Sequence, residues 1–384
     1  MTNVANSTIF TNDVSDGLQY LSDNIDVTIS KNVVIWINTN LPAVVSTRTD
    51  STLINSGIVY GPFGEGVYFE GTNSVITNNA GALIKSAGNG ILAVGPGTVV
   101  NNFGTVIGFS GGLFASGVVL GSNTTLNNKG EVYGALYGAK ADGSAGWALN
   151  NSGLIHSANV GVFLAQSPVG EAPIITNLPG GTIEGDVAAI QTAGLVQLKL
   201  SNRGTIKGAI DCGADADDQI VNKGKIIGEV QLGGGADTFN GKGGTSGAVF
   251  GEAGNDRLIG SAGKNTLVGG LDKDTLTGGN GGDKFVFNDV LDSVVGANRD
   301  RVTDFSHSQH DKIDLHLIDA NTILGGDQAF KFIGKQQFHD AAGELRAAKQ
   351  GKSVIVSGDI DGDGVADFQI QVHAAGLVKG DFIL

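Results

Sequence analysis

Short apolar runs broken by glycine and asparagine fill residues 53–230, and one pattern recurs along them. An apolar residue leads into Asn-x-Gly, and an Ile or Val follows, as in the stretch from Val100 to Val106. The key asparagines are Asn55, Asn79, Asn102, Asn128, Asn151, Asn177, Asn202 and Asn222, at spacings of 24, 23, 26, 23, 26, 25 and 20 residues. Helical periodicity is missing over long stretches. The period predicts coils of two or three short strands, stacked as a parallel β-helix.

A fixed asparagine in every coil has a physical reason in such a solenoid. Asparagine tolerates the left-handed turn conformation, and an asparagine column can form hydrogen bonds from coil to coil. Leucine-rich repeats have a similar period, but their Leu-x-x-Leu-x-Leu frame is missing. We therefore expect an all-β chain with a right-handed parallel β-helix over residues 53–230. Residues 1–52 lack the motif and are expected to cap its open end.

The period shortens from residue 231, where glycine-rich nonapeptides begin. Successive copies start at Gly251, Gly260, Gly269 and Gly278, and a degenerate copy has Gly247 in its Asp position. Two nonapeptides are expected to form one coil, so every second turn stacks on the same side. One side would then carry Asp218, Asp237, Asp256 and Asp274, and the other would carry Gly247, Asn265 and Asp283. For Asp218 a solvated acidic turn is the alternative interpretation.

These nonapeptides resemble the Gly-Gly-x-Gly-x-Asp-x-apolar-x repeat of RTX proteins, the hemolysin-type calcium-binding family. The resemblance implies a parallel β-roll over residues 231–287 that binds several Ca²⁺ ions. Calcium prefers about six to eight oxygen ligands, and glycine turns let several carbonyl groups face one ion. The implied ligand positions are Gly233, Gly235, Asp237, Gly254, Asp256, Gly263, Asn265, Gly270, Asp272, Asp274, Gly279, Gly281 and Asp283, with Asp218 at the start of the column.

Residues 288–384 resemble the serralysin-type C-terminal domain of the M10 metalloprotease family. The resembling stretches include residues 300–305, residues 311–315 and the terminal Asp-Phe-Ile-Leu. The resemblance implies that Asp304 and Asp311 are further calcium ligands. It also implies export by the type I secretion machinery of a Gram-negative cell, read from an uncleaved C-terminal signal. Calcium is scarce in the cytosol and abundant outside, so the chain is expected to fold on calcium after export.

A third acidic motif lies near the C-terminus. Asp359, Asp361 and Asp363 alternate before Gly364, like the start of an EF-hand calcium loop. The bidentate Glu that completes an EF-hand loop is missing, so a tight acidic β-turn is an equally good interpretation. The three aspartates are therefore candidate calcium ligands with an open alternative.

Composition narrows the possible partners. Glycine makes up 62 of 384 residues, and charged residues only 16%, yet the net charge is −14. Such an acidic chain is a poor partner for nucleic acid. The one cysteine, Cys212, excludes an intrachain disulfide. The sequence begins without a basic and then apolar signal, and no apolar run reaches the ~18 residues of a membrane helix, so we expect no membrane span.

The candidate chemistry for an enzyme is thin. The zinc motif His-Glu-x-x-His occurs nowhere in the sequence, so a metalloprotease is not expected. A β-helix joined to RTX turns is also similar to secreted alginate epimerases and polysaccharide lyases. Residues 53–230, however, offer only scattered candidates: Lys85, Lys129, Glu131, Lys140, Asp142 and His156. Of these, His156 is expected in an ordinary turn.

The sequence thus favours a secreted, calcium-binding, non-enzymatic solenoid. We expect it to act at the cell surface or in the extracellular matrix, as an adhesion, biofilm or surface-layer protein. An extracellular polysaccharide or the cell surface itself is the expected partner beside calcium. The alternative is a polysaccharide lyase or uronan C5-epimerase acting in a β-helix groove.

Overall fold

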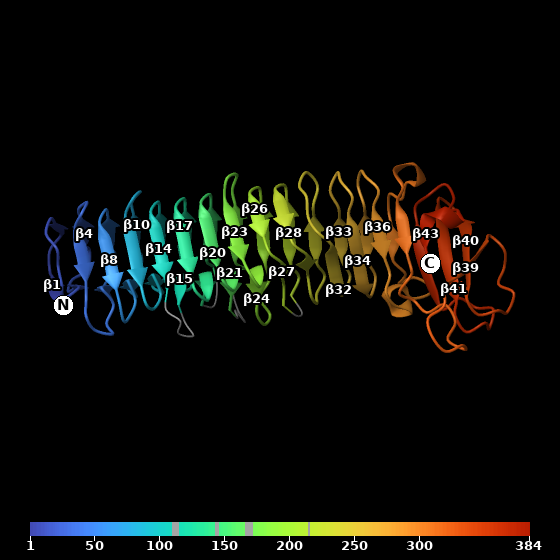
Figure 1. The fold of residues 1–384 in the computed structure, drawn as a ribbon, viewed down its shortest axis with the longest axis horizontal. Coiled ribbons are helices and arrows are strands. Elements are labelled where there is room, and N and C mark those ends of the chain that lie inside the picture. The colour runs from blue at the N-terminus through green and yellow to red at the C-terminus, as the bar shows by residue number, and fades with distance from the viewer. Residues whose placement is uncertain (110–114, 143–145, 166–171, 214–215) are drawn as a thin grey trace. The chain divides into compact units, whose positions relative to one another are not determined.

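The computed structural model describes residues 1–109, 115–142, 146–165, 172–213 and 216–384. Short strands dominate these residues (Figure 1). The chain divides into two compact units. The first contains Met1–Gly213 and Gly224–Ile227, and the second contains Ala214–Lys223 and Gly228–Leu384. Within the described ranges, no helix is long and apolar enough to cross a membrane.

In the first unit each full coil contributes one strand to each of three parallel sheets. The first sheet runs in the order β1 (Thr2–Val4), β3 (Leu18–Tyr20), β6 (Val44–Ser46), β9 (Val67–Phe69), β12 (Ile91–Ala93), β15 (Ser116–Leu120), β18 (Tyr137–Ala141), β21 (Val160–Leu164), β24 (Ala188–Thr192) and β27 (Ile210–Asp211). The second runs β2 (Thr8–Phe10), β4 (Asp26–Ile29), β7 (Thr52–Asn55), β10 (Val75–Asn78), β13 (Val99–Asn102), β16 (Thr125–Asn128), β19 (Ala148–Asn151), β22 (Ile174–Asn177) and β25 (Lys199–Asn202). The third runs β5 (Val34–Trp36), β8 (Ile58–Gly61), β11 (Leu83–Ser86), β14 (Thr105–Gly108), β17 (Glu131–Gly134), β20 (Leu154–Ser157), β23 (Thr182–Gly185), β26 (Thr205–Lys207) and β29 (Lys225–Ile227).

The core of this unit is a set of aliphatic stacks, because every second strand residue points inward. Leu53, Ile76 and Val100 pair in register on adjacent coils and are fully buried. Each such side chain contributes roughly 1.5–3 kcal/mol through burial. Residues 1–52 lack the asparagine motif, yet their strands continue the same ladders, with Val27 paired to Leu53. Their role as a cap stays a prediction.

A buried asparagine ladder follows the inside of the second sheet. Each Nδ2 donates to the Oδ1 of the next asparagine at 2.8–2.9 Å, in the order Asn55, Asn78, Asn102, Asn128, Asn151, Asn177 and Asn202. The remaining Nδ2 hydrogen of each donates to a main-chain carbonyl, for example from Asn102 to Glu131 at 3.0 Å. The predicted column is therefore present.

One predicted member of this column is wrong by a single residue. Asn78, not Asn79, pairs with Asn55 and Asn102, because β10 ends at Asn78. Asn79 is half-buried and donates to Ser56 Oγ at 2.9 Å. The two asparagines are adjacent in the sequence, so only the strand register distinguishes them. Another predicted member, Asn222, belongs to the second unit, where it donates to the carbonyl of Thr245.

The second unit has coils of two strands, as the nonapeptide period predicts. One sheet runs β30 (Val230–Gln231), β32 (Val249–Ala253), β34 (Thr266–Leu271), β36 (Lys284–Val286), β38 (Lys312–Asp314) and β43 (Phe382–Ile383). The other runs β28 (Gln219–Asn222), β31 (Thr238–Asn240), β33 (Arg257–Ile259), β35 (Thr275–Thr277) and β37 (Arg301–Val302). Leu258 pairs with Leu276, and Leu267 pairs with Phe285, so successive coils stack one nonapeptide pair at a time.

The second sheet of this unit continues into a part that contains antiparallel strands. There β37 pairs in parallel with β42 (Phe368–Val372), and β42 is antiparallel to β41 (Ser353–Asp359). Strand β41 is antiparallel to β40 (Glu344–Gln350), and β39 (Lys331–Gly334) pairs in parallel with β40. Leu345, Val356 and Ile370 are fully buried on its inner face. The 3-10 helices η1 (Val290–Ser293), η2 (His307–Gln309) and η3 (Lys379–Asp381) lie in the connections.

Candidate metal centre

A column of aspartates stands in the turns of the second unit, each just before a strand of the β28–β37 sheet. The main-chain N–H of each donates to Oδ1 of the next aspartate. The distances are 2.6 Å from Asp218 to Asp237, 2.9 Å from Asp237 to Asp256, and 2.8 Å from Asp256 to Asp274. Asp274 in turn donates to Asp300 Oδ1 at 2.8 Å. The predicted spacing of 19, 19 and 18 residues thus becomes a continuous column.

A second acidic column lies before the strands of the other sheet. The N–H of Asn265 donates to Asp283 Oδ1, and that of Asp283 donates to Asp311 Oδ1, both at 2.9 Å. Asp304 lies beside them and accepts from the N–H groups of Gly278 and Gly279, both at 2.8 Å. The structure therefore places the predicted ligands Asp304 and Asp311 beside the turns of this second column.

The second oxygen of most of these carboxylates is the decisive feature. Oδ2 of Asp237, Asp256, Asp274, Asp283 and Asp300 is buried and has no hydrogen-bond partner among the described residues. A buried anionic oxygen without a partner is costly, and a bound cation removes that cost. Burial raises the pKa of Asp237 and Asp300 to about 8, that of Asp256 to about 6 and that of Asp274 to about 9. Each group therefore requires a proton or a cation.

Glycines leave the space that these oxygens fill. A Cβ added to Gly251 would lie 2.1 Å from Asp256 Oδ2, and one added to Gly269 would lie 2.2 Å from Asp274 Oδ2. At Gly278 the corresponding distance to Asp283 Oδ2 is 2.4 Å. Before these three aspartates, the glycine five residues upstream is therefore required by contact.

The predicted turn glycines have left-handed backbone with one exception. Their φ angles lie between 88° and 129° at Gly233, Gly235, Gly254, Gly270, Gly279 and Gly281. Asp272 occupies one of these turns as a non-glycine residue, with φ of 79°, and its side chain is exposed. Gly263 does not have positive φ. Its carbonyl instead accepts from Asn265 Nδ2 at 2.6 Å, which makes this turn different from the others.

The asparagine at position 265 closes its own turn. Its Nδ2 also donates to Asp283 Oδ1 at 3.0 Å, while its Oδ1 accepts from the N–H of Ser261 at 3.0 Å. An amide donor thus lies among carbonyl and carboxylate oxygens. That geometry favours a structural role for Asn265 over a ligand role, although the sequence predicted it as a ligand.

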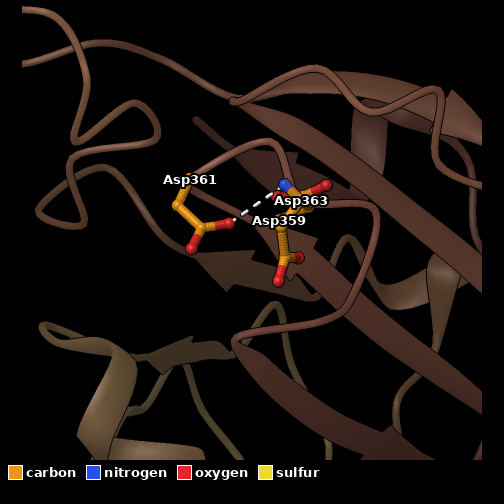
Figure 2. A group of neighbouring side chains, drawn as sticks. All are labelled: Asp359, Asp361 and Asp363. Carbon is orange, nitrogen blue, oxygen red and sulfur yellow. Dashed lines mark hydrogen bonds between the residues drawn. The ribbon is translucent and has the colours of Figure 1, made fainter.

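The third predicted motif forms a cluster. Ligand oxygens of Asp359, Asp361 and Asp363 lie within 4.8 Å of one another, and Figure 2 shows the Asp361 carboxylate beside the main-chain nitrogen of Asp363. Buried Asp359 accepts from the N–H groups of Gly362 and Gly364 at 2.6 and 3.0 Å. Asp361 and Asp363 are exposed. These contacts describe a tight acidic turn, and calcium binding here stays a prediction.

The family pattern described as "Peptidase M10 serralysin C terminal" matches residues 191–384. The chain belongs to this serralysin C-terminal family. The match begins upstream of the first nonapeptide and includes both acidic columns. The resemblance stated from the sequence is thus confirmed.

Two solved structures are similar to part of the chain. They are the AlgE6R2 and AlgE6R3 subunits of the Azotobacter vinelandii mannuronan C5-epimerase, at 25% and 26% identity. The first covers 47% of this chain and 91% of its own, with a TM-score of 0.27. The second covers 44% and 80%, with a TM-score of 0.26. TM-scores this low carry no argument about this chain. No curated protein matches it.

The sequence analysis did not predict Asp300 as a member of the first aspartate column. It lies 26 residues after Asp274, beyond the nonapeptide period, because η1 and its flanking loops intervene. A signal was present nonetheless. Buried Val302 follows Asp300 by two residues, just as Leu276 follows Asp274 by two residues. Val302 and Leu276 pair on adjacent strands.

The first unit places one of its scattered candidates differently from the expectation. His156 lies on strand β20, not in a turn. Its Nε2 is 2.9 Å from Glu131 Oε1, and its ring centroid is 4.9 Å from that of Tyr133. Both partners come from the adjacent strand, β17. The turn assignment of His156 is therefore wrong.

Proposed function

We propose that this chain is a secreted calcium-binding solenoid protein that folds on calcium after type I export. It acts outside the cell as a non-enzymatic adhesion, biofilm or surface-layer protein. Membership of the serralysin C-terminal family supports calcium binding and export. The observation that carries the proposal is the set of five buried carboxylate oxygens without partners.

The residues fit calcium by their chemistry. Oδ2 of Asp237, Asp256, Asp274 and Asp300 would serve one side of the roll, and Asp283 the other. Main-chain carbonyls of the left-handed glycine turns would complete an all-oxygen set, which suits a hard cation. When bound, calcium supplies positive charge that stabilises ionised, buried carboxylates. Several ions are expected, because the carboxylates are spread over successive coils.

Calcium coupling also gives the export step a direction. Without a cation these carboxylates disfavour the folded roll, so the chain stays loosely folded where calcium is scarce. Outside the cell calcium binding stabilises the native state through mass action. A partner polysaccharide or cell surface would then be bound only by the exported protein.

The test is a calcium titration of the calcium-free full chain, in which circular dichroism and sedimentation are measured at each calcium concentration. We expect a cooperative gain of β-structure in calcium and no comparable gain in magnesium, which demands a smaller octahedral site. A chain whose spectrum and melting temperature ignore calcium would contradict the proposal. Export is tested by measuring the protein in the medium of cells with and without a type I exporter.

A second candidate function is a polysaccharide lyase or uronan C5-epimerase in the first unit. The group formed by Tyr133, His156 and Glu131 favours it, because such reactions need a base and a proton donor beside the sugar carboxylate. The test is absorbance of unsaturated product with a panel of uronate polymers. Turnover that disappears in His156→Ala would replace the non-enzymatic proposal.

A further inference from the structure

The outer face of the C-terminal antiparallel sheet is basic, although the whole chain carries a net charge of −14. Directly paired residues of a sheet point to the same side. Arg346 on β40 pairs with Ser357 on β41, which pairs with Gln369 on β42. Arg301 on β37 pairs with Gln371 on β42. Cationic, amide and hydroxyl side chains thus share one face.

Two hollows are found on this basic face. One of about 310 Å³ is lined by Arg299, Arg346 and Lys349, together with Ser357 and Gln369. The other, of about 200 Å³, is lined by Arg301, Ser353, Gln371 and His373. Neither lining includes an acidic residue. The two hollows share strands β41 and β42, so they lie along the same sheet.

The arginines of the larger hollow are held in place without an anionic partner. Arg299 Nε is buried and has no hydrogen-bond partner, and no ion pair in the described ranges uses Arg299, Arg346 or Lys349. Arg346 donates to Gln337 Oε1, and its guanidinium lies 5.6 Å from the Phe338 ring centroid. A buried guanidinium N–H without a partner is unfavourable. A ligand oxygen would satisfy it.

We propose that this basic face binds an acidic polysaccharide. Arginine forms paired hydrogen bonds with carboxylate or sulfate groups, which suits Arg299 and Arg346. Ser357, Gln369 and Gln371 offer partners for sugar hydroxyls. Adjacent hollows provide places for successive sugar units. The two linings contain no Phe, Tyr or Trp on which a nucleic-acid base could stack and offer only the imidazole of His373, and the choice of a polysaccharide rests on the extracellular role proposed above.

The test uses the calcium-loaded full chain and isothermal titration with oligogalacturonate, neutral cello-oligosaccharide and inorganic sulfate. The variant is Arg299→Gln with Arg346→Gln. The control, Arg203→Gln with Lys335→Gln, makes the same charge change at exposed sites elsewhere. We expect oligogalacturonate binding to weaken at least about ten-fold in the variant and to stay unchanged in the control. The neutral oligosaccharide should not bind.

Equal affinity in the variant and the wild type would overturn the proposal, as would equal weakening in the control. Tighter binding of single-stranded oligonucleotide would reassign the face to nucleic acid, and binding of sulfate alone would reject a polysaccharide. The exposed Arg301→Gln serves as a second variant if the double variant does not fold. Circular dichroism in calcium reports failure of calcium-dependent folding separately, because the binding test requires the folded chain.

Discussion

Each of the two units buries columns of polar side chains, and the two kinds of side chain have opposite consequences. The asparagines of the first unit stand at the ends of strands, and the aspartates of the second unit stand just before strands. In the first unit Asn102 donates to Asn128 and to a carbonyl and accepts from Asn78, so the amide is both donor and acceptor. In the second unit Asp256 accepts an N–H through Oδ1, but its Oδ2 has no partner. A carboxylate offers acceptors only, so such a column cannot satisfy itself.

From this difference we expect the first unit to be stable by itself and the fold of the second to depend on a bound cation. The asparagine ladder is neutral, and its hydrogen bonds join neighbouring coils directly. In the aspartate column, burial is the main cause of the raised pKa of Asp274, and the like charges of Asp300 and Asp256 raise it further. A neutral column suits permanent structure, whereas a charged column suits a structure that forms only when a cation is present.

Calcium removal should produce the largest difference in stability between the two units. Chelation should unfold much of residues 231–384, because the buried carboxylates lose their counter-charge, while residues 53–200 keep their asparagine ladder. Hydrogen exchange measured by mass spectrometry, with and without chelator, reads both regions in one sample. Protection that falls equally in both would show that the asparagine ladder is not self-sufficient.

Placing an aspartate in the asparagine ladder tests the same difference within the first unit. Asn151→Asp removes the donor to Asn177 Oδ1 and should destabilise the first unit by roughly 1–3 kcal/mol or more, without rescue by calcium. The control is Asn150→Asp at the neighbouring half-buried position, which removes the part-buried hydrogen bond to Asn127 Oδ1 and leaves the buried ladder intact. Chemical denaturation of both variants measures the difference, and rescue of Asn151→Asp by calcium would contradict it.

The converse exchange should weaken the calcium requirement. Asp274→Asn removes a buried charge, so the calcium-free roll should become more stable while the calcium-loaded roll becomes less stable. Melting temperatures at both calcium levels give the two changes. A loss of stability under both conditions would mean that charge is not the reason for the conditional fold.

Within the aspartate column, Asp274→Ala should cost more than Asp237→Ala. Asp274 packs against Gly269, which leaves room for its carboxylate, whereas Leu232 stands at the corresponding position before Asp237. Asp274 therefore belongs to the more complete turn. An extra loss of about 1 kcal/mol would lower the melting temperature by roughly 2–4 °C in calcium. Equal melting temperatures of the two variants would show that both turns contribute equally to stability and would contradict this prediction.

The same carboxylates predict a pH dependence of the calcium-free chain. The folded-state pKa values of about 6 for Asp256 and about 9 for Asp274 lie above the ordinary value of 3.8. The folded roll thus binds more protons than the unfolded chain, so its stability falls as pH rises from about 4 to 9. Melting curves at pH 5 and pH 8 in chelator measure this. Saturating calcium should reduce or reverse the trend, since calcium competes with protons.

Much of this architecture was predictable from local pattern. Equivalent residues of successive coils stack on one another, so the number of residues per coil appears directly as a sequence period. This explains the period near 25 residues, the shorter nonapeptide period and the spacing of Asp237, Asp256 and Asp274. The asparagine register was off by one at position 79 because Asn79 fits Asn-x-Gly with Gly81, whereas Asn78 keeps the two-residue distance from the preceding apolar residue, Ile76. Only the strand pairing distinguishes them.

The tertiary structure decided what local pattern could not encode. Asp300 joins the column across a loop, because pairing of Val302 with Leu276 brings it there. Which carboxylate oxygen is left without a partner depends on the N–H of the neighbouring coil. The basic face also needs the sheet, since Arg299 and Arg346 are distant in sequence and meet only where β40, β41 and β42 pair. Repeats can be recognised in short stretches of sequence, but the burial of a side chain and its contacts with residues distant in sequence depend on the folded chain.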